Sequence, residues 1–164
     1  MKKETYERIF NKINAVPHGR ECIVWLSRLL TDGTAVLYFF VIGLLVLQAK
    51  YLQAGAVIFV PAVSFLLLSL VRHLINARRP YEVHAFQPLI SKESAGHSFP
   101  SRHVFSIFVI ATTIFWFYPA VAVAIWLMGI ALAIIRVVSG VHFPRDVIAG
   151  MAIGILCGCL VTLF

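Results

Sequence analysis

The chain has 164 residues, of which 60% are hydrophobic and only 13% are charged, and its mean hydropathy is +0.90. Soluble domains carry about a quarter charged residues, so this composition excludes an ordinary soluble enzyme and indicates an integral membrane protein. The net charge of +7 would suggest nucleic acid in a soluble protein. Here the basic residues flank apolar stretches, so we expect phosphate headgroups, and no nucleic acid, as partners.

Residues 2–14 carry four apolar side chains at helical spacing, with the basic residues elsewhere on the helix. This pattern predicts an amphipathic helix lying in the membrane interface. Residues 20–31 form either a second interfacial helix or an extension of the first span. Residues 1–21 are charged and lack an apolar core, so we expect no cleavable signal peptide. The four apolar positions are Tyr6, Ile9, Phe10 and Ile13.

Long uncharged stretches predict five spanning helices. An apolar helix needs about 20 residues to cross a bilayer, so the stretch 103–135 is too long for one crossing. Pro119 lies near its middle, and proline favours the first turn of a helix, so the stretch divides into two spans. We expect an all-α, polytopic membrane bundle, a single domain over 1–164 with an interfacial N-terminal segment (1–31) and a helical core (32–164). The predicted spans are 32–49, 52–76, 102–117, 119–139 and 144–164.

One side of this bundle is strongly basic. Successive spans alternate in direction, so the ends of spans two and four share a side with the starts of spans three and five. Of the 14 Lys and Arg residues, only Lys50 lies on the other side. The one long connection, 77–101, is also on the basic side, and we expect it to form an ordered cap there.

Residues suited to holding a phosphate group gather on the basic side. Arginine binds phosphate through a planar, permanently charged fork. Ser101 and the free backbone N–H groups of a helix start can also hold phosphate oxygens, although Ser101 equally suits a helix N-cap. A single arginine at the end of an apolar helix is usually a membrane anchor, but four on one side favour phosphate binding. The four are Arg72, Arg79, Arg102 and Arg136.

Two histidines and one aspartate on the same side suit an attack on phosphorus. Asp146 follows His142 by four residues, so in a helical turn its carboxylate can hold the imidazole tautomer and stabilise the charged ring. Imidazole is a competent nucleophile, and His103 can protonate a leaving oxygen. Metal-ligand spacings such as H-E-x-x-H are absent from the sequence, so we expect neither a catalytic metal nor another cofactor. The remaining histidines are interpreted as surface or interface residues: His18, His73, His84 and His97.

These residues occur in three runs with fixed spacing. The runs are Arg72-x6-Arg79-Pro80, Pro100-Ser101-Arg102-His103 and Ile135-Arg136-x5-His142-x3-Asp146. In order and spacing they resemble the signature of the type 2 phosphatidic acid phosphatase superfamily: K-x6-R-P, then P-S-G-H, then S-R-x5-H-x3-D. The resemblance covers roughly residues 20–164, and the triple motif is far more specific than any of its parts.

The resemblance implies a membrane lipid phosphatase, a hydrolase that needs no metal and forms a phosphohistidine intermediate. It implies that His142 is the nucleophile, that Asp146 orients it and that His103 is the general acid. The implied substrate is a lipid phosphate or diphosphate, first undecaprenyl diphosphate of cell-wall synthesis, then phosphatidylglycerophosphate or phosphatidate. A non-catalytic lipid-phosphate binder or transporter is the alternative, and vanadium-dependent haloperoxidase chemistry is a third. The implied phosphate-binding residues are Arg72, Arg79, Ser101 and Arg136.

Three positions depart from the signature. Arg72 replaces the lysine, which keeps the charge but changes the geometry. Arg102 replaces the glycine and adds a cation that either binds a second phosphate, favouring a diphosphate, or faces the headgroup layer. Ile135 replaces the serine and removes one hydrogen-bonding group.

The membrane face of the site receives two opposite indications. The positive-inside rule places the basic side in the cytoplasm. Bacterial members of the resembled family that act on polyprenyl diphosphates work on the outer face. We expect a multi-pass protein of the cell membrane with its site on the extracytoplasmic face.

Overall fold

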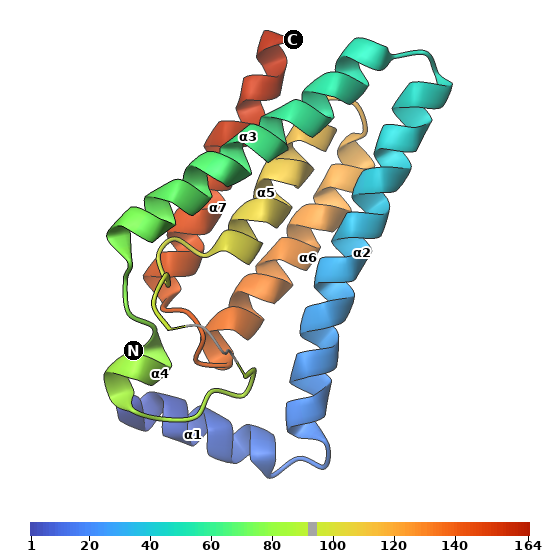
Figure 1. Cartoon of the computed structure of the whole chain (residues 1–164). Coiled ribbons are helices and arrows are strands. Elements are labelled where there is room, and N and C mark those ends of the chain that lie inside the picture. Colours follow the sequence, from blue (N-terminus) through green and yellow to red (C-terminus); the bar gives the residue numbers. More distant parts are fainter. Residues whose placement is uncertain (92–94) are drawn as a thin grey trace.

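Helices account for the architecture of the computed structural model, which describes residues 1–91 and 95–164 (Figure 1). The chain is an all-α membrane bundle, as expected. Its helices are α1 (Lys3–Asn14), α2 (Gly19–Leu47), α3 (Tyr51–Ile75), α4 (Pro80–His84), α5 (Arg102–Phe115), α6 (Pro119–Val138) and α7 (Pro144–Gly158), which continues into the 3₁₀ helix η1 (Cys159–Leu163).

Four helical stretches of the described chain are long and apolar enough to cross a membrane: Gly19–Leu47, Tyr51–His84, Pro119–Val138 and Pro144–Leu163. The prediction of a fifth full span at 102–117 is wrong, because the helix found there, α5, is too short to cross a membrane on its own. Helix α5 has 14 residues, or about 21 Å, against about 30 Å of hydrocarbon. Most of its side chains are buried among the other helices. Because protein surrounds it, α5 does not need the length of a helix exposed to lipid.

The N-terminal part of the chain forms two helices. Helix α1 matches the predicted interfacial helix and lies across one end of the bundle (Figure 1). Helix α2 runs without interruption from Gly19 to Leu47. Residues 20–31 are therefore the extension of the first span, and no helix boundary lies at position 32.

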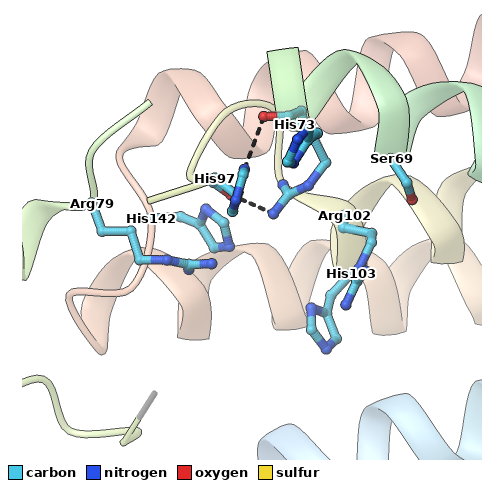
Figure 2. A pocket seen from close by; sticks show the side chains of 8 residues that line it. Ser69, His73, Arg79, His97, Arg102, His103 and His142 are labelled. Carbon is cyan, nitrogen blue, oxygen red and sulfur yellow. Dashed lines mark hydrogen bonds between the residues drawn. The ribbon is translucent and has the colours of Figure 1, made fainter. Parts of the chain in front are cut away.

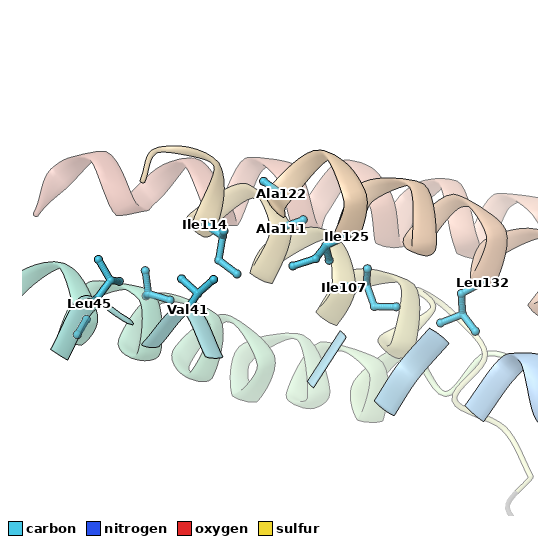
Figure 3. Packing of buried hydrophobic residues seen from close by; sticks show 10 residues of the cluster. Val41, Leu45, Ile107, Ala111, Ile114, Ala122, Ile125 and Leu132 are labelled. Carbon is cyan, nitrogen blue, oxygen red and sulfur yellow. The ribbon is translucent and has the colours of Figure 1, made fainter. Parts of the chain in front are cut away.

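The apolar core lies where α2, α5 and α6 meet (Figure 3). Lipid tails are as apolar as these side chains, so burial from water contributes little here, and close van der Waals packing holds the helices together. The cluster includes Val41, Leu45, Ile107, Ala111, Ile114, Ala122, Ile125 and Leu132.

Helix α7 packs closely on α5 through glycines at every fourth position. A Cβ added to Gly150 would lie 2.7 Å from the backbone oxygen of Ser101, and one on Gly154 would lie 2.8 Å from the oxygen of Phe105. This spacing of small residues lets two helix backbones approach each other. As a result the starts of both helices meet, and the Ser101 N–H donates to the Asp146 carbonyl oxygen at 2.8 Å.

The predicted gathering of helix ends is confirmed. The end of α3, the start of α5, the end of α6 and the start of α7 lie at the same end of the bundle as α1 and α4 (Figure 1). Lys50 lies in the connection between α2 and α3 at the opposite end. The predicted cap, 77–101, contains α4, and its residues 92–94 lie outside the described part of the chain.

Candidate active site

A polar cavity of about 200 Å³ opens at the basic end of the bundle. It brings together five of the eight predicted site residues, whereas the other three, Ser101, Arg136 and Asp146, are buried outside its lining. Arg79 and His142 lie on one side of the cavity, and Arg102 and His103 lie on the other (Figure 2). Its lining consists of Ser69, Arg72, His73, Arg79, His97, Arg102, His103 and His142.

His142 and Asp146 are both almost fully buried and face each other. Nδ1 of His142 is 3.7 Å from Oδ2 of Asp146, which is too long for a hydrogen bond but short enough for a strong electrostatic contact. Ser98 contacts both groups. Its hydroxyl donates to Oδ2 of Asp146 at 2.5 Å and lies 3.4 Å from Nδ1 of His142.

The Ser98 contacts decide which nitrogen of His142 is available. A serine hydroxyl that donates to the carboxylate can still accept a hydrogen bond, so it favours a proton on Nδ1 of His142. Nε2 then keeps its lone pair. Burial lowers the pKa of His142 to about 4, more than Asp146 raises it, and the Arg79 charge lowers it further. The ring is therefore neutral near pH 7, which is the state that a nucleophile requires.

Asp146 is held by the start of helix α7. Pro144 occupies the first helical position, where its missing N–H costs nothing. Oδ2 of Asp146 accepts the N–H of Phe143 at 3.0 Å, so the carboxylate caps its own helix. Asp146 can therefore serve both as the acidic residue that stabilises the first turn of its own helix and as the carboxylate that faces His142.

Arg79 is buried and ties the α3–α4 connection to the loop after α6. Its Nε donates to the Gly96 carbonyl at 2.9 Å and its Nη1 to the Val141 carbonyl at 3.3 Å. Glu82 holds the backbone of the same region, because its two carboxylate oxygens accept the N–H groups of Arg79 and Gly96 at 2.6 and 2.7 Å. The guanidinium is thus fixed at the cavity wall with further N–H donors available.

Arg72 closes helix α3 and reaches the segment before α5. Its two terminal nitrogens donate to the carbonyl oxygens of Pro100 and His97. In return, Nδ1 of His97 lies 3.1 Å from the Arg72 carbonyl oxygen. A guanidinium has five N–H donors, so Arg72 can shape this loop and still offer donors to an anion in the cavity.

The start of α5 supplies the opposite side of the cavity. Ser101 is the N-cap residue by position, yet its buried hydroxyl makes no hydrogen bond among the described residues. His103 is half-buried in the second position of the helix, and Arg102 before it is exposed. The first N–H groups of a helix suit an anion, whereas the Ser101 hydroxyl is buried outside the cavity lining.

Arg136 lies behind the cavity rather than in its lining. Its side chain is buried, and Nε has no hydrogen-bond partner among the described residues. Its carbonyl oxygen accepts the N–H groups of Val141 and His142 at 3.2 and 3.1 Å. Arg136 thus holds the turn that carries His142. Ile135, in place of the signature serine, is also buried.

Sequence reasoning gave no role to several residues of the site. Ser98 starts the run that contains Ser101, but an isolated serine carries no pattern of its own. His73 and His97, interpreted as surface residues, line the cavity, and their rings stack with centroids 5.4 Å apart. The sequence signal that pointed to His97 was its position in the connection 77–101, which was predicted to cap this end of the bundle.

An apolar groove leads from the cavity along the bundle between α2, α3 and α5. A cavity of about 420 Å³ shares Arg102 and His103 with the polar cavity and is otherwise mainly apolar. It adjoins a second apolar cavity of about 560 Å³. Both are lined by Tyr38, Phe39, Phe65, Ser106 and Ile110.

The donor set for a metal ion is poor throughout residues 1–91 and 95–164. In that part of the chain no three His, Cys, Asp or Glu side chains are grouped so that they could hold a metal ion. The positive charge around the cavity comes instead from Arg72, Arg79 and Arg102.

Comparison with known proteins agrees with the three motifs. The family model of the PAP2 superfamily matches residues 50–164, so the family resemblance is confirmed. A lipid A 1-phosphatase of Rhizobium johnstonii is 37% identical over 114 residues, which are 65% of this chain and 46% of the relative. A bacitracin transport permease protein BcrC of Bacillus licheniformis is 28% identical over 131 residues, 77% of this chain and 64% of the relative. The chain spans about half the length of the first of these relatives.

Two solved structures share the fold over almost the whole chain. LpxE of Aquifex aeolicus has a TM-score of 0.73 at 23% identity, covering 98% of this chain and 94% of its own. A PAP2-type phosphatidylglycerolphosphate phosphatase of Bacillus subtilis also has a TM-score of 0.73 at 23% identity, covering 99% and 85%. The likeness includes α1 and most of α2, which precede the region that the family model matches.

Proposed function

The chain belongs to the PAP2 superfamily, and from this premise we propose that it is a membrane lipid phosphatase with His142 as the nucleophile. One observation carries the proposal. A buried, neutral imidazole held by Ser98 and Asp146 opens onto a cavity that is otherwise lined with arginines, histidines and one serine, Ser69.

In the first step, the Nε2 lone pair of His142 attacks phosphorus, and the bond from phosphorus to the leaving oxygen breaks. His103 gives its proton to that oxygen. The ring of His142 becomes positively charged as it takes the phosphoryl group, and Asp146 is close enough to stabilise that charge. Arg72 and Arg79 neutralise the phosphoryl oxygens.

In the second step, water attacks the phosphohistidine. His103, now deprotonated, takes a proton from that water, the bond from nitrogen to phosphorus breaks, and inorganic phosphate leaves. His103 is protonated again and His142 is neutral, so the site returns to its starting state. Fixed arginines supply the positive charge in both steps, which is the advantage of a preorganised site.

The substrate we propose is a polyprenyl diphosphate, with undecaprenyl diphosphate first. Arg102 adds a cation, and the stacked pair His73 and His97 adds hydrogen-bonding nitrogens, to the lining beyond the residues of the family signature, which suits a second phosphate. The apolar groove begins at Arg102 and His103, so one hydrocarbon chain can lie along it while its phosphates occupy the cavity. The BcrC relative, described by its role with bacitracin, agrees with this choice.

A lipid A 1-phosphate is the second candidate, because the relatives described as lipid A 1-phosphatases share 36–37% of aligned residues with this chain. The decisive experiment measures phosphate release by the purified protein from matched lipids. We expect the polyprenyl diphosphate to exceed the corresponding monophosphate, lipid A 1-phosphate and phosphatidylglycerophosphate in kcat/KM. Binding of these lipids without phosphate release would favour the non-catalytic binder.

Metal independence is part of the proposal. Turnover should persist in excess EDTA after metal stripping, because arginines replace the metal charge. Orthovanadate should inhibit, since it mimics five-coordinate phosphorus on the nucleophile. Loss of turnover that Mg²⁺ or Zn²⁺ restores would contradict the mechanism.

We propose that the site faces the extracytoplasmic side, following the family expectation against the positive-inside rule. Labelling of a single cysteine in intact cells tests this. In a variant whose three cysteines are replaced by alanine, Lys3→Cys reports the site side, and Lys50→Cys, at the other end of the bundle, is the matched control. A membrane-impermeant maleimide should label only the first variant, and labelling only the second would place the site in the cytoplasm.

A further inference from the structure

Helix α1 contributes one fully buried side chain, Tyr6, to the basic end of the bundle. The ring of Tyr6 lies against Phe86 with centroids 5.0 Å apart and against Phe10 at 6.2 Å. Phe10 and Phe86 meet edge to face at 5.2 Å. The apolar face predicted to enter the membrane interface is thus used partly inside the protein.

This aromatic cluster packs against the turn that carries the proposed nucleophile, His142. Gly140, two residues before His142, has a φ of +74°. A Cβ at this position would lie 2.6 Å from the Phe86 ring and 3.0 Å from the Phe10 ring. The rings therefore pack directly against the backbone of the turn and leave no room for a side chain at this position.

A second contact path runs from Tyr6 to the carboxylate. The Tyr6 ring is 6.1 Å from that of His84, which is 6.3 Å from the Phe143 ring. The N–H of Phe143 donates to Oδ2 of Asp146. Tyr6 is thus linked through His84 and Phe143 to the residues that surround Asp146.

The hydroxyl of Tyr6 makes no hydrogen bond among the described residues. Oη of Tyr6, Nε2 of His84 and Oδ1 of Asp146 are all buried, and none of them makes a hydrogen bond among the described residues. Oδ1 of Asp146 has one charged neighbour, Nε of the exposed Arg145 side chain, at 3.6 Å. Buried polar atoms are almost always satisfied in a working protein. Burial and the negative charge of Asp146 raise the pKa of Tyr6 to about 12, so its hydroxyl is a proton donor near pH 7.

We propose that Tyr6 is a positioning residue of the active site: its ring supports the His142 turn, and its hydroxyl donates to Oδ1 of Asp146, the carboxylate oxygen without a hydrogen bond among the described residues, when His142 becomes charged. This inference rests on the proposed function, because it takes His142 as the nucleophile. It makes α1, which precedes the region that the family model matches, a part of the catalytic machinery.

The test uses Tyr6→Phe, which removes the hydroxyl and keeps the ring. Tyr118→Phe is the matched control, because Tyr118 also has a buried hydroxyl without a hydrogen bond but lies at the far end of the bundle, at the start of α6. The probe is orthovanadate, which binds through His142 whatever the lipid tail. Its Kd, the kcat and KM for the preferred lipid, and the Tm are measured on the full chain in detergent.

We expect Tyr6→Phe to weaken vanadate binding and lower kcat by roughly 3- to 10-fold, with KM unchanged, with a Tm no lower than that of wild type, and with Tyr118→Phe equal to wild type in Kd and kcat. A purely structural hydroxyl predicts instead that Tyr6→Phe leaves the vanadate Kd and the kcat at their wild-type values, whatever its effect on Tm. That result overturns the inference. Wild-type protein that neither binds vanadate nor releases phosphate overturns the proposed function, and the Tyr6 inference with it.

Discussion

The two sides of the polar cavity are built differently. On the His142 side the polar groups are buried, and each makes a second contact: Ser98 with Asp146, Arg79 with Val141, Asp146 with its own helix start. On the Arg102 side the guanidinium is exposed and lies over the face of Phe65, 5.4 Å from the ring centroid. Groups fixed in place suit chemistry that requires one geometry, whereas an exposed cation at the mouth of the groove suits the choice among substrates.

The fixed side should give the largest loss. His142→Ala removes the proposed nucleophile, and we expect phosphate release to fall by several orders of magnitude while the protein keeps its fold. The measurement is single-turnover phosphate release, with circular dichroism and Tm as folding controls. Retention of more than about a tenth of the activity would rule out His142 as the nucleophile.

The lowered pKa of His142 reflects the burial of this side of the cavity. Only the neutral ring attacks, and its pKa is lowered from 6.5 to about 4. Neutral His142 therefore persists as pH falls through 6.5 and declines about tenfold per unit only below about pH 4. Histidine-labelled protein followed by NMR, with His142→Gln for assignment, measures this titration without interference from substrate ionisation. A midpoint near 6.5 would mean that water reaches the ring.

Replacing Ser98 tests whether the hydrogen bonds that hold His142 and Asp146 in place contribute to activity. Ser98→Ala removes the hydroxyl shared by His142 and Asp146, and a hydrogen bond to a charged group is worth about 1.5–3 kcal/mol, or roughly 10- to 150-fold in kcat. Ser69→Ala is the matched control, because Ser69 lines the same cavity but donates to the Phe65 carbonyl of its own helix. Equal small losses in both variants would reduce Ser98 to a packing residue.

The same contrast explains what the sequence could predict. Regular spacing predicted the helices, and the three motifs predicted Arg79, His103 and His142 as neighbours, because each motif sits at a helix end and helix ends meet. The length of α5 was missed, because hydropathy does not distinguish a helix surrounded by lipid from one surrounded by protein. Ser98 was missed because its role depends on a contact across 48 positions.

Arg102 should give the smallest and most selective effect. It replaces the glycine of the family signature and stands where the polar cavity meets the apolar groove. A guanidinium that contacts a second phosphate from an exposed position contributes near the low end of charged hydrogen bonds, about 1.5 kcal/mol, or roughly tenfold. Arg102→Gly should therefore lower kcat/KM for a polyprenyl diphosphate about tenfold and leave that for the corresponding monophosphate nearly unchanged.

The two lipids share one tail, so the ratio of their kcat/KM values isolates the second phosphate from any effect of Arg102 on the groove. Arg102→Lys separates charge from shape, because lysine keeps the cation but not the fork. A partial restoration of diphosphate preference by lysine would indicate that charge dominates. Equal losses on both lipids would assign Arg102 to the shared phosphate site, and no loss on either would leave it as a side chain that contacts only Phe65 and headgroups.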